Sequence, residues 1–155
     1  MHLLGKLGFH IHYVTVGIGR EDLDDPNPPV IPEGYTVRLV DLPDMLPFAN
    51  KVADLTRENL EDSFANDDEC GAAFFGDELV SFSFNKRSRT RVTPQLDAII
   101  PKGFRYSYKA WTHPEHTRRN LSKATGYVRR FAPQRTYQER MVSYTETHNY
   151  PSLLH

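Results

Sequence analysis

The segment from His113 to Lys123 holds the residues whose types and spacing best suit a chemical task. It reads HPEHTRRNLSK, with Arg118, Arg119 and Lys123 close together. It follows an expected strand and opens an expected helix, whose first backbone N–H groups have no partner within the helix. Such amides, a positive dipole end and clustered cations bind phosphate groups well. The segment therefore predicts an anion-binding loop; the alternative is an ordinary capped helix whose arginines face water.

Charge is divided unevenly along the chain, although its formal net charge is only −1. Residues 85–140 carry fourteen Lys and Arg against three acids, a net charge of +11. The rest of the chain carries five against seventeen, a net charge of −12. A basic half of this strength indicates an anionic partner: a nucleic acid, a phosphorylated cofactor or an acidic surface. The alternative is a solvated basic face balanced by the acidic half of the same fold.

Length and composition exclude several classes of protein. A chain of 155 residues favours one domain of ordinary size, and 39% hydrophobic residues exclude a wholly disordered chain. The one cysteine, Cys70, excludes an internal disulfide or a CxxC site, and we expect it to be a small buried residue. No apolar stretch approaches the roughly 18–20 residues of a membrane span, and the start has no secretory signal. We therefore expect a cytoplasmic protein.

The elements that must position the loop follow from apolar periodicity. The expected strands are 9–16, 34–40, a hairpin over 72–84 with its turn at 76–78, 103–112 and 141–146. We expect Val80, Phe82 and Phe84 on one face of the hairpin. Residues 85–102 are undecided between a loop, a short helix and a strand.

Four helices are expected. The first begins at Asp41 and has an apolar stripe of Phe48, Val52 and Leu55. The second lies near 60–64, the third covers 120–131, and the last begins at His148. The order β-β-α-α-β-β-β-α-β-α predicts an α+β domain with a mixed, mostly antiparallel twisted sheet flanked by helices. Residues 1–33 form an N-terminal strand and an acidic, proline-rich lead, and residues 34–155 form the main domain.

At this point the sequence resembles the GNAT superfamily of acyl-CoA-dependent N-acyltransferases. In that family a strand leads into the loop V-x-P-E-x-R-G-x-G-x-G/A, then a helix, another strand, and an Asn that opens a further helix. Here Thr112-His113-Pro114-Glu115-His116 matches the end of the strand, Leu121-Ser122-Lys123-Ala124 matches the helix start, and 144–153 matches the later strand and its Asn. The resemblance covers residues 34–155 by element order and about 112–124 and 142–153 by motif. It implies a GNAT fold and acyl transfer from acetyl-CoA or another acyl-CoA to an amine.

The loop departs from the family pattern at three positions. Thr117 stands where the family usually has Arg or Gln, Asn120 replaces the central glycine, and Ser122 replaces the last Gly or Ala. Family glycines let backbone amides approach the phosphates. Asn tolerates left-handed backbone and Ser is small, so we expect the loop to keep its shape. The basic side chains would then replace lost backbone contacts with charge.

The resemblance implies roles for particular residues. The cofactor would lie against Trp111, Thr112, Arg118, Arg119, Asn120, Leu121, Ser122 and Lys123, and Asn149 would contact the pantetheine arm. Glu146 is the expected base and Tyr108 a proton relay. The alternatives are half-buried sheet residues for Glu146 and Tyr108, and a helix N-cap for Asn149.

The family's final strand has no counterpart before His155, whether or not that residue is the natural terminus. Either the chain is a truncated copy, or the place of that strand is taken by residues 9–16 or by a second subunit. A free sheet edge predicts a homodimer through that edge. Other signals are weaker: His113, Glu115 and His116 match no standard metal site, so no metal is expected. A non-catalytic GNAT-derived module that binds a CoA-like ligand or a protein is the second interpretation, and nucleic-acid binding is not favoured because no motif accompanies the charge.

Overall fold

The computed structural model describes residues 12–17, 28–52, 55–93, 96–130 and 140–146. Their main feature is a six-stranded sheet in the order β1-β8-β7-β4-β3-β2, in which only the β7–β8 pair is parallel. The strands are β1 (His12–Gly17), β2 (Tyr35–Val40), β3 (Glu69–Phe75), β4 (Glu78–Lys86), β7 (Phe104–Thr112) and β8 (Arg140–Glu146). The predicted mixed α+β class is confirmed, and the expected helix from His148 lies outside the described residues.

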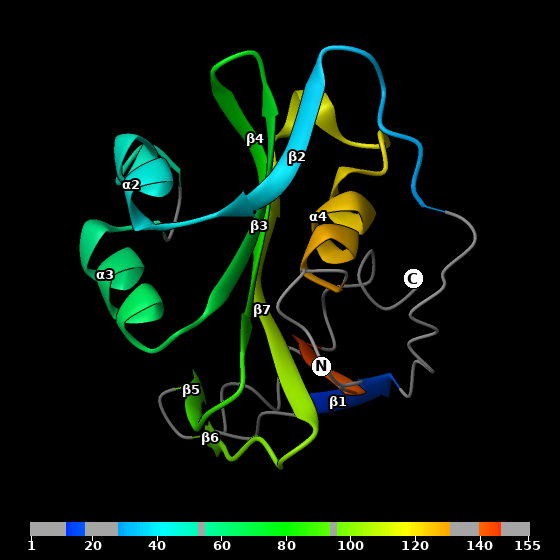
Figure 1. Cartoon of the computed structure of the whole chain (residues 1–155). Helices are drawn as coiled ribbons and strands as arrows, with labels where there is room; N and C mark the ends of the chain where they lie inside the picture. Colours follow the sequence, from blue (N-terminus) through cyan, green and yellow to red (C-terminus); the bar gives the residue numbers. More distant parts are fainter. Residues whose placement is uncertain (1–11, 18–27, 53–54, 94–95, 131–139, 147–155) are drawn as a thin grey trace, which may run out of the picture.

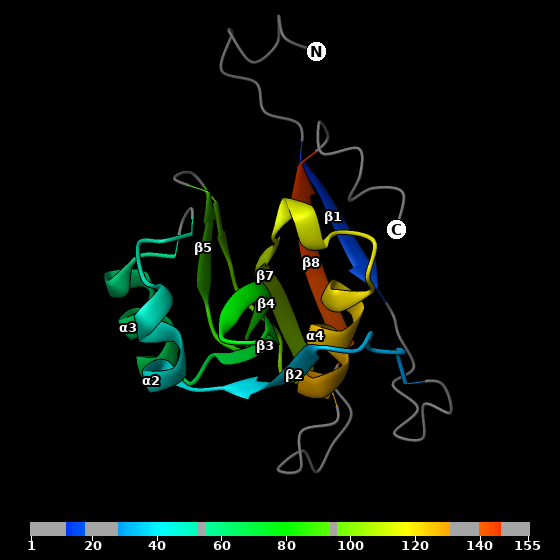
Figure 2. The same cartoon turned by 90° about the horizontal axis from the view of Figure 1, so that it is seen from above.

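Helices cover both faces of the sheet. The short helix α2 (Leu42–Met45), the 3-10 turn η1 (Leu46–Phe48) and α3 (Arg57–Ala65) lie on one face, and α4 (Leu121–Arg130) lies on the other (Figures 1 and 2). The larger core, which includes Leu60, Phe82 and Phe84, is on the α2/α3 face. A smaller core of Ala73, Val80 and Leu121 is on the α4 face. No helix in the described part of the chain has the length and apolar character that crossing a membrane needs.

The N-terminal strand fills the place beside β8, as one of the expected alternatives predicted. β1 pairs antiparallel with β8 from His12 opposite Glu146 to Gly17 opposite Met141. The N-terminal segment 1–33 therefore contributes a strand to the same sheet as residues 34–155. β1 and β2 are the two edge strands of that sheet. Dimerisation through an edge stays a prediction.

The predicted long helix from Asp41 to Leu55 is wrong. It begins where expected, because Asp41 and Asp44 form a reciprocal capping box, but α2 ends at Met45. Pro47 has no N–H to donate to the Pro43 carbonyl, so the α-helical hydrogen-bond ladder ends and a 3-10 turn follows. Asn50 then takes the left-handed region at φ 63°. Phe48, Val52 and Leu55 still pack on the larger core, so the pattern predicted burial correctly but not conformation.

Two details of the strands also differ from expectation. In β4, Ser81 pairs with Ala73 and Leu79 with Phe74, so Val80 is an extra residue in the ladder. Val80 therefore joins the α4-side core, whereas Phe82 and Phe84 face α2 and α3. The undecided segment 85–102 contains the end of β4 and a separate two-stranded sheet of β5 (Thr90–Thr93) and β6 (Leu96–Ala98).

Replacing Asp44 with alanine is expected to destabilise the fold by about 1 kcal/mol, because it removes a capping carboxylate. The Arg38 guanidinium also donates to both Asp44 oxygens at 2.7 Å, but this exposed pair adds little. The Arg38 hydrogen bonds lower the pKa of Asp44 from 3.8 to about 2. Its stabilisation is therefore present above pH 3.8 and is lost as the pH falls toward 2. Urea unfolding at several pH values measures this, with Glu33→Ala as the charge-matched control; equal losses in both variants would contradict it.

Candidate functional site

The expected anion-binding loop lies between β7 and α4 and keeps an unusual backbone. A 3-10 turn (Pro114–His116) is followed by Arg118 at φ 61° and Asn120 at φ 59°. These left-handed conformations are uncommon for residues other than glycine and occur in backbone concavities that bind anions. The expectation that Asn120 takes left-handed backbone is confirmed. Arg118 does the same without glycine or a short polar side chain.

Contacts from two neighbouring elements, β4 and β2, hold this loop in place. The His113 N–H donates to the Val80 carbonyl at 2.8 Å, which ties the start of the loop to the β4 bulge. The Tyr35 hydroxyl of β2 lies 2.7 Å from His116 Nδ1. The Arg119 guanidinium lies 5.7 Å from the centre of the Tyr35 ring, within cation–π range. The loop is thus positioned by β2 and β4 as well as by its own strand and helix.

The helix that follows presents its N-terminal end beside the basic side chains. The Ala124 N–H donates to the Asn120 carbonyl at 2.9 Å, so Asn120 stands at the start of α4. Arg118, Arg119, Ser122 and Lys123 are exposed, whereas Leu121 is buried in the α4-side core. The structure therefore brings the basic residues together at a helix end, and Leu121 anchors that end to the sheet.

The neighbouring strands separate at the same end of the sheet. β7 and β8 pair from Phe104 opposite Arg140 to Ser107 opposite Ser143, and this pairing goes no further. β7 continues for five residues to Thr112, and β8 continues for three residues to Glu146 along β1. The last residues of the two strands are therefore not hydrogen-bonded to one another. This is where an extended ligand can enter between two strands.

The structure brings some of the sequence-predicted residues together and places others apart. The loop residues 118–123 lie together, and Thr112 lies at the end of β7 beside Ser81, whose hydroxyl is 2.9 Å from its own. Trp111 stacks on Phe82 against the larger core, on the α2/α3 side of the sheet. Glu146 is the last residue of β8, and the structure describes its backbone. Asn149 lies outside the described residues.

Tyr108 is positioned by a buried polar cluster on the α2/α3 face, formed by Ser63, Asp68, Lys86 and Tyr108. Its hydroxyl donates to Asp68 Oδ2 and lies 2.9 Å from the Ser63 hydroxyl. Lys86 Nζ donates to the same carboxylate oxygen at 3.3 Å. Burial and the Asp68 contact raise the pKa of Tyr108, so the phenol is protonated at neutral pH. Burial also raises the pKa of Asp68, the Tyr108 and Lys86 contacts opposing it.

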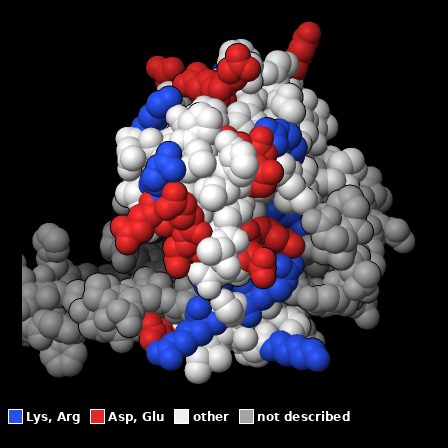
Figure 3. Space-filling model, turned by 60° about the vertical axis from the view of Figure 1, so that its left-hand side comes forward, with Lys and Arg blue, Asp and Glu red and all other residues white. Residues whose placement is uncertain are grey.

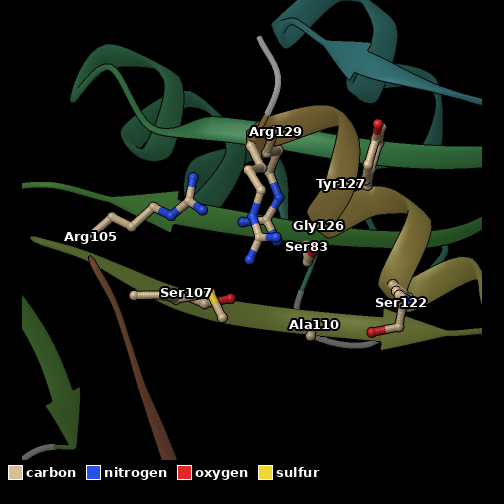
Figure 4. A pocket seen from close by; sticks show the side chains of 11 residues that line it. Ser83, Arg105, Ser107, Ala110, Ser122, Gly126, Tyr127 and Arg129 are labelled. Atoms are coloured by element: carbon tan, nitrogen blue, oxygen red, sulfur yellow. The ribbon is translucent and has the colours of Figure 1, made fainter. Parts of the chain in front are cut away.

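A pocket of about 290 Å³ under α4 was not expected from the sequence. Ser122 and Lys123 line it near the loop, and Arg105, Arg129 and Arg130 line it at the far end of the helix. Figure 4 shows Arg105 reaching from β7 and Arg129 from α4 into the same space. The signal that sequence reasoning missed is the spacing, because 122, 126 and 129 share one helix face and 105 and 107 share one strand face.

Other expectations concern cysteine and metal. Cys70 is buried, as predicted, and burial raises the pKa of its thiol to about 12. Within the described residues, no three side chains of His, Cys, Asp or Glu gather closely enough to hold a metal ion.

Comparison with solved structures identifies the architecture. A tandem GNAT protein from the clavulanic acid biosynthesis pathway aligns over 99% of this chain with 14% identity and a TM-score of 0.57. A ribosomal-protein-alanine N-acetyltransferase from Brucella melitensis biovar Abortus 2308 aligns over 77% of this chain and 87% of its own, with 16% identity and a TM-score of 0.51. This chain has the GNAT fold.

The GNAT fold is what these similarities show, because identities of 13–16% do not carry an activity from one protein to another. A GCN5-related N-acetyltransferase from Kribbella flavida, with 13% identity and a TM-score of 0.50, aligns over 88% of this chain and 48% of its own. The chain spans 51% of the tandem GNAT protein. It thus covers about half the length of these two structures. No family model matches the chain, and no curated protein matches its sequence.

Proposed function

We propose that this GNAT-fold chain is an acyl-CoA-dependent N-acyltransferase that uses acetyl-CoA or another acyl-CoA and acylates an amine of a small molecule or protein. The observation that carries the proposal is the separation of β7 and β8 after Ser107 and Ser143, next to the basic N-terminal end of α4. The loop residues 118–123 fit a diphosphate, because they combine backbone amides at a helix start with cationic side chains. The space between the strands fits the extended arm of such a cofactor.

The reaction needs an acceptor amine, proton transfer and an oriented thioester. The amine nitrogen bonds to the acyl carbon, the carbon–sulfur bond breaks, and the thiolate leaves and takes up a proton. We propose Glu146 as the base that takes the proton of the acceptor ammonium. Tyr108, the first β7 residue beyond the paired segment, can accept a proton only while donating its own to Asp68. The relay through Tyr108 would therefore end on Asp68, whose raised pKa favours protonation.

The charge on the α2/α3 face supports a cationic acceptor. Exposed acids on and beside these helices include Asp41, Glu58, Glu61, Asp62 and Asp67. Figure 3 shows acids gathered over this side of the molecule. An anionic cofactor on the α4 side and an amine approaching from the acidic side would meet between β7 and β8.

A second candidate function is binding without catalysis. It is favoured by one observation, the presence of Arg118 and Asn120 rather than glycine at positive φ. Non-glycine residues there place side chains where backbone amides would otherwise approach a ligand closely. Release of free thiol from acetyl-CoA, measured across a panel of amines, separates the two functions, since a binder releases none.

We expect acetyl-CoA to raise the melting temperature of the wild-type chain, and Ser122→Glu to abolish that rise. At a hundred times its Kd, a ligand stabilises the fold by about 2.7 kcal/mol. Ser122 is exposed in the first turn of α4, where a carboxylate is compatible with the helix dipole but repels a diphosphate.

The matched control is Ser88→Glu, an exposed residue between β4 and β5. It adds the same charge away from α4 and should keep the acetyl-CoA response. If both variants respond as the wild type does, the diphosphate does not bind at the start of α4. If the wild-type chain shows no response either, the proposal of acyl-CoA binding fails.

A further inference from the structure

The pocket under α4 has a cationic far end. Arg105 on β7 is 2% exposed and Arg129 on α4 is 3% exposed, and both line the pocket with the partly buried Arg130. Four of the described residues that line it are Lys or Arg. Figure 4 shows the side chains of Arg105 and Arg129 converging on one space beside Ser107. A cavity lined in this way favours an anionic occupant.

The chemistry of guanidinium narrows the kind of anion. Its planar fork binds carboxylates and phosphates through paired hydrogen bonds, and such charge-assisted bonds are strong when water is excluded. Arg129 is held in position because its Nε donates to the Thr125 carbonyl at 3.2 Å. The pocket has a volume of about 290 Å³ over its whole length, from Ser122 to the arginines. The part beside the arginines therefore has room for a small group.

The position of the arginines relates them to the acyl group. α4 runs back along β7, so Arg105 and Arg129 lie at the opposite end of the pocket from Ala110 and Ser122. Ala110 is five steps along the strand from Arg105, a distance of about 16 Å at the usual rise of a strand. A cofactor held by its diphosphate at the start of α4 has room along this path for its arm. The far end of its acyl chain would then meet the arginines.

We propose that the acyl group ends in a carboxylate, as in succinyl-CoA or glutaryl-CoA, and that Arg105 and Arg129 bind this carboxylate. This inference rests on the proposed acyl transfer. The acidic α2/α3 face, where the acceptor is expected to approach, lies across the sheet, so the carboxylate is assigned to the acyl donor. In the transfer the amine nitrogen bonds to the thioester carbon, the carbon–sulfur bond breaks, and the amine proton passes through the base. The thiolate is protonated and the distal carboxylate is carried unchanged into the product amide.

The test compares apparent Kd values from thermal shifts of the wild-type chain with acetyl-CoA, succinyl-CoA and pentanoyl-CoA. Pentanoyl-CoA has a chain of similar length without the charge. We expect succinyl-CoA to bind at least ten times more tightly than pentanoyl-CoA. Equal affinities, with binding of acetyl-CoA retained, would overturn the carboxylate assignment and leave the proposed transferase standing. Absence of binding by all three would overturn both.

Variants locate the preference within the pocket. Arg105→Met and Arg129→Met should each reduce the ratio of the pentanoyl-CoA Kd to the succinyl-CoA Kd at least several-fold. Arg130→Met, at a less buried residue that lines the same end of the pocket, should also lower this ratio and guards against a folding defect in the first two variants. Arg57→Met, on α3, removes the same charge from an exposed i,i+4 pair and should keep the ratio. An unchanged ratio in all three pocket variants would refute the assignment. Stabilisation by free succinate or free glutamate equal to that by succinyl-CoA would assign the arginines to a separate carboxylate ligand instead.

Discussion

Gly71→Val is expected to prevent close docking of α4 on the sheet and to destabilise the fold by about 3 kcal/mol or more. This value is at the upper end of the range for overpacked sites. A Cβ atom at Gly71 would lie 2.3 Å from the Thr125 carbonyl oxygen and 3.1 Å from Arg129 Cγ. Both neighbours belong to α4, and the nearer one is backbone, so a change of side-chain rotamer cannot relieve the clash. The whole helix would have to move outward.

Gly71→Ala adds the smallest side chain and is expected to cost about 2 kcal/mol for the same reason. The matched control is Gly126→Ala, because Gly126 lies within α4 and a Cβ there would meet Arg129 Nη2 at an ordinary 3.8 Å. Replacing a glycine inside a helix by alanine stabilises it by about 0.5–1 kcal/mol. The urea concentration at the midpoint of unfolding should therefore be lower than in the wild type for Gly71→Ala and higher for Gly126→Ala. A Gly71→Ala variant as stable as the wild type would show that α4 does not need this close approach.

The displacement of α4 has a consequence for ligand binding. The Ser83 and Thr125 hydroxyls lie 3.1 Å apart, and the Thr125 hydroxyl donates to the Ser122 carbonyl, so the docking point and the start of the helix are linked. Helix movement would alter both the loop and the arginine pocket. We therefore expect Gly71→Ala to weaken the acetyl-CoA thermal shift as well as the fold.

The sequence predicted those elements whose signals are local. The acids Asp41 and Asp44 around Pro43 marked a helix start, and the turn at Gly76-Asp77-Glu78 marked the hairpin. The position of α4 also followed from its periodicity. The end of α2 was missed because the apolar stripe through Phe48, Val52 and Leu55 outweighed Pro47, although burial does not require helix.

The candidate site was predictable only where it is continuous in sequence. Residues 118–123 form one loop and one helix turn, so their convergence followed from the order of elements. The arginine pocket combines β7 with the far end of α4, and its depth depends on how closely the helix approaches Gly71. The link between Tyr108 and Asp68 joins residues 40 positions apart. Such contacts depend on tertiary packing, which spacing along the chain does not encode.

Asp68→Ala is the other substitution with a large expected effect, a loss of about 3–5 kcal/mol. The Asp68 side chain is 1% exposed and that of Lys86 is 10% exposed, and their charged atoms lie 3.3 Å apart. Removing the carboxylate leaves the ammonium in a buried place without the charge that offsets its desolvation. It also removes the acceptor of the Tyr108 hydroxyl.

A double substitution separates the charge effect from packing. If the cost of Asp68→Ala comes mainly from the stranded ammonium, Asp68→Leu with Lys86→Met should be more stable than Asp68→Ala alone, because no charge remains buried. Tyr108→Phe removes one hydroxyl and keeps the ring against Phe84, so it should cost only about 1 kcal/mol. Urea unfolding of these three variants measures the differences. If the double variant is no more stable than Asp68→Ala, the loss of stability in Asp68→Ala does not come from the unpaired ammonium of Lys86. In that case the loss reflects the volume of the removed side chain, and Asp68 contributes chiefly by filling space beneath α3.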